Sequence, residues 1–116
     1  MKNAAVVTAL AALAQHSRLG VFRLLVKAGP GGMPAGQVAG KLDLSPSVLT
    51  FHFDRLRDAG LVTVRREGRS MIYAAQFDAM NALVAFLTEN CCGGAACAPA
   101  VTCNPALKKP ARARAS

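Results

Sequence analysis

Residues 44–62, LSPSVLTFHFDRLRDAGLV, decide the fold of this chain. Ser45 followed by Pro46 is a strong helix start, because a serine hydroxyl accepts a hydrogen bond from a free amide of the first turn and proline fits the first helical position. Gly60 is a natural C-terminal stop. The stretch therefore predicts a helix over residues 46–59. An apolar stripe at helical spacing marks its buried face: Leu49, Phe53 and Leu56.

The upstream part of the chain predicts three further helices. The first covers the alanine-rich residues 4–14, and the second covers residues 18–28 with Ser17 as its N-cap. A short third helix is expected to start at Pro34 and to continue through residues 37–42. The apolar stripes at helical spacing are Val6, Leu10 and Leu13; Leu19, Phe22, Leu25 and Val26; and Val38, Ala39 and Leu42, of which the last set is expected to face inward.

Downstream of residue 60 the pattern changes to short extended runs. Residues 61–67 and 69–75 are expected strands that meet at Glu67-Gly68, a hairpin signal. A last helix is expected over residues 77–90. Its apolar positions are Phe77, Met80, Leu83, Val84 and Leu87. The fold class is therefore mainly α with one β-hairpin. A short helix, a tight turn, a well-capped helix and a hairpin in this order indicate a winged helix-turn-helix.

In such a fold the second helix of the helix-turn-helix, here residues 46–59, contacts DNA with its exposed face, and the wing adds further contacts. The candidate DNA-binding residues are Ser45, Ser47, Thr50, Phe51 and Arg55 on the helix and Arg65, Arg66 and Arg69 in the hairpin. Hydroxyl groups can hydrogen-bond bases or phosphates, and an exposed Phe51 can touch a thymine methyl. Cations at a hairpin tip suit phosphate contacts or a narrow minor groove.

Several of these residues have a structural alternative. Ser47 could support the helix cap, Phe51 could pack against a neighbouring subunit or loop, and the hairpin cations could be the ordinary charges of an edge strand. His52 lies nearer the buried side of the helix and is expected to be a structural histidine, not a metal ligand. Arg18 and Arg23 are expected to be surface charges or supports of the second helix.

Length and charge set broad limits. The 116 residues suffice for one domain with a core, and the net charge is +8, with four of the positive charges in the last nine residues. A basic chain fits a nucleic-acid partner without requiring one. No run reaches the ~18 apolar residues of a membrane helix. Residues 1–14 imitate a secretory signal with a cleavage site after Ala14, but one charge and a stretch diluted by polar residues favour a cytoplasmic protein.

All four cysteines lie within residues 91–103, directly after the last expected helix: Cys91, Cys92, Cys97 and Cys103. In the cytosol these thiols would be mostly reduced. Cys91 and Cys92 make a poor disulfide, because adjacent α-carbons are ~3.8 Å apart and a relaxed bridge spans ~4.4–6.8 Å. Neighbouring thiols with a third nearby are suited to holding a soft, thiophilic ion.

Residues 44–62 resemble the recognition segment of the ArsR/SmtB family of metalloregulatory repressors. The run Arg65-Arg66-Glu67-Gly68-Arg69 followed by Tyr73 is similar to the wing of that family, and residues 13–25 are similar to its approach to the second helix. The likeness covers residues 5–90. It implies a winged-helix homodimer that binds an inverted-repeat operator and leaves it when an inducer binds. It also implies a dimer interface built from the first and last helices, here residues 6–13 and 77–87.

The chain departs from the family's founding pattern in the third helix. Arsenic repressors of the best-known type carry a Cys-x-Cys motif there, and the matching residues 33–38 contain no cysteine. A subgroup of arsenic repressors instead places an adjacent cysteine pair and a later cysteine at the end of the last helix. Cys91 and Cys92 with either Cys97 or Cys103 resemble that arrangement.

The ligand chemistry agrees with this resemblance. Thiolates select soft ions, and trivalent arsenic and antimony are pyramidal and take three sulfurs on one side. Cys97 closes the shorter loop and is favoured as the third ligand, while Cys103 stays open because doubling a loop adds only ~0.6 kcal/mol. The inducer is therefore expected to be As(III) or Sb(III), with methylarsenite needing only Cys91 and Cys92.

Other functions remain open from the sequence. The thiols could hold structural zinc or an iron–sulfur cluster, or sense oxidants. A small thiol enzyme and a constitutive DNA-packaging protein are further alternatives, although no catalytic set or phosphate loop is present and no catalytic cofactor is expected. The expected organisation is a DNA-binding and dimerisation domain at residues 1–90, an inducer-binding segment at 91–103 and a flexible basic tail at 104–116.

Overall fold

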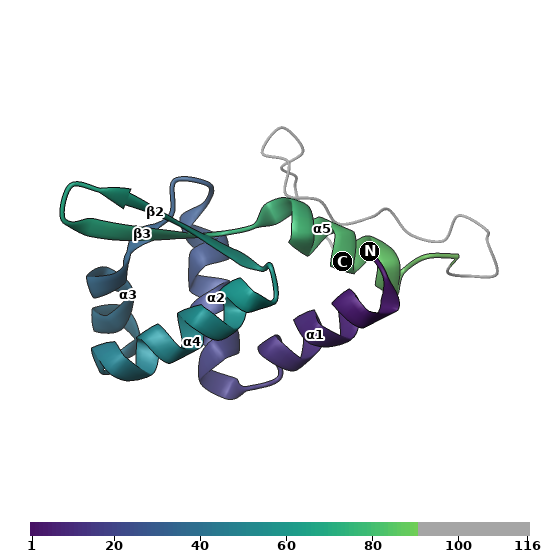
Figure 1. Cartoon of the computed structure of the whole chain (residues 1–116), viewed down its shortest axis with the longest axis horizontal. Coiled ribbons are helices and arrows are strands. Elements are labelled where there is room, and N and C mark those ends of the chain that lie inside the picture. The colour runs from purple at the N-terminus through teal and green to yellow at the C-terminus, as the bar shows by residue number, and fades with distance from the viewer. Residues whose placement is uncertain (91–116) are drawn as a thin grey trace, which may run out of the picture.

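The computed structural model describes residues 1–90, and this part contains five helices and one small sheet (Figure 1). The predicted winged helix-turn-helix is confirmed. The inducer-binding segment predicted at 91–103 and the flexible tail predicted at 104–116 lie outside the described residues. In chain order the elements are α1 (Asn3–Leu13), α2 (His16–Ala28), β1 (Met33–Pro34), α3 (Ala35–Leu42), α4 (Pro46–Asp58), β2 (Val62–Glu67), β3 (Ser70–Ala75) and α5 (Phe77–Leu87).

The sheet has three antiparallel strands in the order β1-β3-β2, where the sequence predicted only a two-stranded hairpin. The additional strand is β1, whose Met33 lies opposite Tyr73 of β3. Gly32 precedes it with a φ of 76° and approaches β3 so closely that a β-carbon there would lie 2.5 Å from the carbonyl oxygen of Tyr73. A residue with no β-carbon is therefore required where the chain enters the sheet.

Two predicted helix boundaries are wrong by one turn or less. The second helix begins at His16, and its N-cap is Gln15, not Ser17, because the Gln15 side-chain oxygen accepts a 2.8 Å hydrogen bond from the amide of Arg18. The start predicted for the third helix at Pro34 is correct to within one residue, because Pro34 is the N-cap and the helix begins at Ala35. The last helix ends at Leu87, before the predicted residue 90.

The core lies between α4, α2 and the inner face of the sheet. Its largest fully buried side chains are Phe53, Leu25, Leu56, Leu61, Val21 and Val38. The predicted buried stripe of α4 is confirmed at Leu49, Phe53 and Leu56. The buried residues of α1 are Val6, Ala9 and Ala12, while Leu10 of its apolar stripe is 40% exposed. Leu19 of the apolar stripe of α2 is 42% exposed.

Helices α1 and α2 meet at a sharp corner, bent by 102°. Within residues 1–90, no single helix is both long and apolar enough to cross a membrane, although this bent pair reaches that length and composition when its two helices are taken together. The corner brings the last turn of α1 next to α4, and α1 also packs against α5.

The elements of residues 1–90 are divided between two ends of the molecule. Figure 1 shows the wing turn between β2 and β3 at the same end as α3 and the start of α4, while α1 and α5 lie together at the opposite end. The elements expected to read DNA are thus gathered at one end, and the helices expected to form a dimer lie at the other.

Candidate nucleic-acid interface

The start of α4 is fixed by the cap that the sequence predicted. Ser45 has an extended backbone, and its Oγ accepts a 3.3 Å hydrogen bond from the amide of Val48, while Pro46 begins the helix. Ser47 takes no part in this cap, so its exposed hydroxyl keeps its full hydrogen-bonding capacity. Before the cap, Asp43 ends α3 in the left-handed conformation with φ 55° and forms the sharp turn between the two helices.

The outer face of α4 carries most of the side chains predicted to contact DNA. Thr50 is exposed and donates its hydroxyl to the carbonyl of Pro46 at 2.9 Å, which leaves the oxygen free to accept. Val48 shares this face and is 44% exposed. Val48 was not among the predicted DNA-binding residues, because a valine in a helix is usually taken as part of the core. An exposed valine beside hydroxyl groups can contact the methyl group of thymine.

Phe51 and Arg55 form a pair on the same face. The guanidinium carbon of Arg55 lies 5.2 Å from the centroid of the Phe51 ring, a cation–π contact one helical turn apart. Phe51 is 52% exposed and borders a groove of about 410 Å³ between α1 and α4, which Val7 and Ala11 line from the α1 side. The position of Phe51 is compatible with both roles considered from the sequence, contact with a base and contact with another chain.

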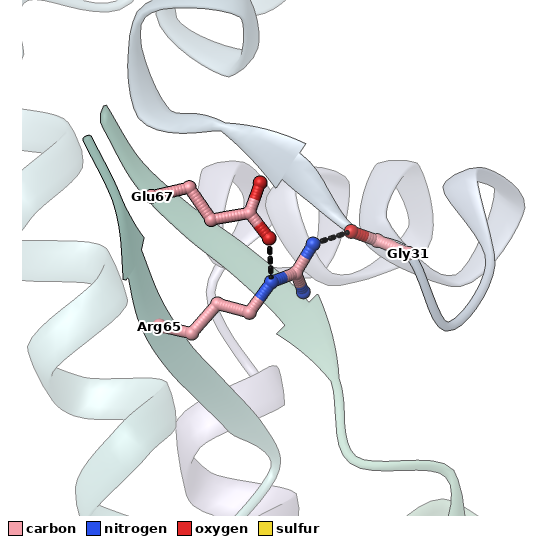
Figure 2. A network of polar contacts seen from close by, with 3 residues as sticks. All are labelled: Gly31, Arg65 and Glu67. Atoms are coloured by element: carbon pink, nitrogen blue, oxygen red, sulfur yellow. Dashed lines mark hydrogen bonds and ion pairs between the residues drawn. The ribbon is translucent and has the colours of Figure 1, made fainter. Parts of the chain in front are cut away.

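The three predicted wing cations occupy different environments. Figure 2 shows the guanidinium of Arg65 between Glu67 and Gly31: its Nε donates to the Glu67 carboxylate at 2.6 Å, and one terminal nitrogen donates to the Gly31 carbonyl at 2.7 Å. Arg65 thus ties β2 to the loop that precedes β1. The sequence assigned Arg65 to DNA, and the structure gives its hydrogen bonds to the protein itself.

Arg66 and Arg69 lie nearer the tip of the wing. The register pairs Glu67 with Ser70, so Gly68 and Arg69 form the turn, and Gly68 has the positive φ of 62° that glycine adopts without strain. Arg66 donates from Nε to the Gly68 carbonyl at 3.2 Å. Arg69 is exposed, and its side chain makes no hydrogen bond or ion pair within residues 1–90, which makes it the most available of the three cations.

Behind the recognition helix lies a buried polar contact. His52 is 5% exposed on the inner side of α4, as predicted for a structural histidine, and its Nδ1 lies 3.5 Å from a terminal nitrogen of Arg18. Burial, and then the charge of Arg18, lower the pKa of His52 from its ordinary value. Arg18 is therefore a support, one of its two predicted roles, while Arg23 on the same helix is exposed.

The described residues offer no metal site. Residues 1–90 contain no group of three His, Cys, Asp or Glu side chains placed to hold an ion, and no cysteine occurs before position 91. The predicted ligands Cys91, Cys92, Cys97 and Cys103 all lie outside the part of the chain that the structure describes.

The cap, the exposed helix face and the adjacent wing define a DNA-binding domain of the winged helix-turn-helix class. Comparison with known proteins agrees: residues 13–65 match a family model described as a helix-turn-helix domain. The HTH-type transcriptional regulator YgaV of Escherichia coli K12 is 31% identical to this chain over 72% of its length and 82% of the relative.

Solved structures extend this likeness to the whole described fold. An ArsR-like transcriptional regulator from Rhodococcus sp. RHA1 superimposes with a TM-score of 0.65 at 26% identity, covering 75% of this chain and 78% of that one. The homodimeric winged helix-turn-helix domain of Mb0332 from Mycobacterium bovis gives a TM-score of 0.60 at 26% identity, covering 74% and 80%. The chain belongs to the ArsR/SmtB family of helix-turn-helix transcriptional regulators.

Proposed function

We propose that this protein is a cytoplasmic repressor that binds operator DNA as a homodimer and releases it when trivalent arsenic or antimony binds its C-terminal thiolates. One observation carries the proposal. All four cysteines of the chain fall within thirteen residues that begin just after α5, at Cys91 and Cys92, and none occurs in the DNA-binding domain. A DNA-binding regulator whose thiols are all gathered in one such segment is suited to sensing a thiophilic ion.

The chemistry favours a metalloid over other ligands. Soft thiolates select soft ions, and a pyramidal trivalent centre needs three sulfurs on one side. Cys91, Cys92 and Cys97 would supply them across a short loop that contains two glycines, and Cys103 is the alternative third ligand. Tetrahedral zinc would require all four thiols or a ligand from elsewhere, whereas a trivalent metalloid is complete with three.

Exposed apolar side chains support a dimer through the end opposite the wing. Val7 is 64% exposed on α1 and Leu87 is 58% exposed on α5, and these two helices pack against each other. Burying such side chains between two copies would be favourable. The Mycobacterium bovis relative is described as homodimeric, and a two-fold dimer would match an inverted-repeat operator.

The proposed release is a population shift. Cys91 follows the last residue of α5 by four positions, so an ion held there would restrain the end of a helix that contacts α1. A dimer held in a geometry that no longer spans two half-sites loses affinity for DNA. A coupling of about 1–3 kcal/mol would weaken operator binding by about 5–150-fold.

The test uses the full reduced chain and an operator selected from random DNA by the protein itself. Fluorescence anisotropy would follow release on addition of arsenite, antimonite, methylarsenite, zinc or hydrogen peroxide. We expect release by the trivalent metalloids, and we expect Cys91→Ser and Cys92→Ser to bind operator normally but to stay bound. Comparing Cys97→Ser with Cys103→Ser identifies the third ligand.

The same experiment separates the remaining alternatives. Release by zinc alone, or by peroxide with reversal by a reducing agent, would replace the metalloid with a zinc or redox signal acting on the same thiols. Operator binding that ignores every one of these reagents would contradict inducible release altogether.

A further inference from the structure

Arg18 links three helices at the corner between α1 and α2. Its Nε donates a 2.7 Å hydrogen bond to the carbonyl of Ala12 in the last turn of α1. A terminal nitrogen of the same guanidinium lies 3.5 Å from Nδ1 of His52, on the inner side of α4. The backbone of Arg18 belongs to the first turn of α2, where Gln15 caps it. One side chain therefore touches the end of α1 and the back of the recognition helix.

The contact between Arg18 and His52 favours one form of the imidazole ring. Because a guanidinium can only donate hydrogen bonds, the contact is a hydrogen bond when Nδ1 accepts, which is the neutral ring with its proton on Nε2. Arg18 makes no ion pair with any carboxylate of residues 1–90. Its bonding partners in this part of the chain are thus two neutral acceptors, one on α1 and one on α4.

Close packing alone does not join α1 to α4. The groove of about 410 Å³ separates the two helices along part of their length, and Arg18 lines it together with Ala12 and Phe51. The hydrogen bonds of Arg18 therefore connect two helices, α1 and α4, that apolar side chains join only in part. Thr50 lies on the side of α4 opposite His52, while the centroid of the Phe51 ring lies 6.0 Å from that of the His52 ring.

The geometry points to Arg18 as a positioning residue for sequence-specific DNA binding. It holds the recognition helix at one orientation relative to α1 without touching DNA. Base contacts need side chains placed to within a fraction of an ångström, whereas non-specific attraction to phosphates depends mainly on charge. Loss of the bridge should therefore weaken specific binding much more than non-specific binding.

The experiment compares the affinity of the full chain for its selected operator with its affinity for a scrambled duplex of equal length. Arg18→Met keeps the aliphatic stem and removes both hydrogen bonds. Arg23→Met is the matched control, because Arg23 lies on the same helix, is exposed and makes no hydrogen bond or ion pair within residues 1–90. Both variants lose one positive charge, so their non-specific binding should fall alike. We expect the ratio of the two affinities to fall at least about tenfold for R18M and to change less than about twofold for R23M.

A second pair of variants tests the same bridge from the side of α4. His52→Leu removes the acceptor, while His52→Asn places an amide oxygen close to the former Nδ1. We expect H52L to lower the ratio of operator affinity to scrambled-duplex affinity as R18M does, and we expect H52N to keep most of that ratio. The R18M/H52L double variant should lower the ratio no further than the more severe single variant. If R18M does not fold, H52L and H52N decide the matter alone.

Two results would overturn the inference. One is an unchanged affinity ratio in folded R18M or H52L, with both affinities falling in parallel, as expected if Arg18 only stabilises the fold. The other is an equal loss in H52L and H52N, which would show that the contact between Arg18 and His52 does not set the orientation of the helix.

Discussion

The ring of Phe53 in α4 stacks on the ring of Tyr73 in β3, with centroids 3.6 Å apart and planes within 5° of parallel. This stack joins the recognition helix to the wing, the two elements that must approach DNA together. Both side chains are buried, Phe53 almost completely. The relative position of helix and wing is therefore set inside the core.

Phe53→Ala should lower the free energy of unfolding by about 3–5 kcal/mol, because it removes a large buried side chain and its stacking partner loses contacts. Tyr73→Phe is the control. The Tyr73 hydroxyl makes no hydrogen bond within residues 1–90, so its removal should change the stability by less than about 0.5 kcal/mol. Urea denaturation measures both values. A small effect of F53A would show that the stack does not anchor α4.

Gly32→Ala should destabilise the fold where the chain enters the sheet. A left-handed residue other than glycine costs about 1–3 kcal/mol, and the new β-carbon would in addition lie 2.5 Å from the carbonyl oxygen of Tyr73. Gly40→Ala is the matched change, because Gly40 lies within α3 and a β-carbon there meets nothing within 4 Å. It should stabilise the fold by about 0.5–1 kcal/mol. Equal unfolding midpoints for the two variants would contradict this account.

Local signals made much of the fold predictable. The cap at Ser45 and the helical spacing of Leu49, Phe53 and Leu56 act within a few residues of one another, and both were confirmed. Strand β1 was missed because two residues have no periodicity and the partner strand lies far along the chain. The contact of Arg65 with the Gly31 carbonyl was missed for the same reason, since alternation places a side chain on a face but not opposite a particular atom.

Sequence spacing did not show which apolar side chains of α1 and α2 are buried. Helix α1 is apolar on nearly every side, so spacing alone could not select Val6, Ala9 and Ala12 as its buried positions. Leu19 continues the apolar pattern of α2 and is nevertheless exposed. A sequence pattern shows that a side chain is apolar, but it does not show whether that side chain packs within its own chain or against another chain. The thiol site stays a prediction, because its residues lie beyond position 90.

Acidification should destabilise the native state through His52. Its pKa is lowered in the folded protein by burial and by Arg18, whereas the unfolded chain keeps the ordinary value near 6.5. Above that pH both states are neutral at this site and stability is unaffected. As the pH falls below it, the unfolded state binds the proton first, and stability is lost progressively toward the lower folded pKa.

His52→Asn has no titrating group at this position and serves as the reference. The difference between the unfolding free energies of the two proteins, measured by urea denaturation between about pH 7.5 and 5, should change as the pH falls, because the wild type loses more stability. A constant difference between wild type and H52N over this range would show that His52 titrates alike in both states.

Arg69 and Arg65 should affect DNA binding differently. Arg69→Ala removes from the wing turn a cation that has no ion-pair partner within residues 1–90, so operator affinity should fall and the slope of log K against log salt should shrink by about one per protomer. The matched variant is Arg65→Met with Glu67→Gln, which removes the ion pair of Figure 2 without changing the net charge. Because Arg65 already donates to Glu67 and Gly31, we expect its salt slope to stay unchanged. A slope that falls as far in this double variant as in R69A would mean that Arg65 leaves these partners to bind phosphate.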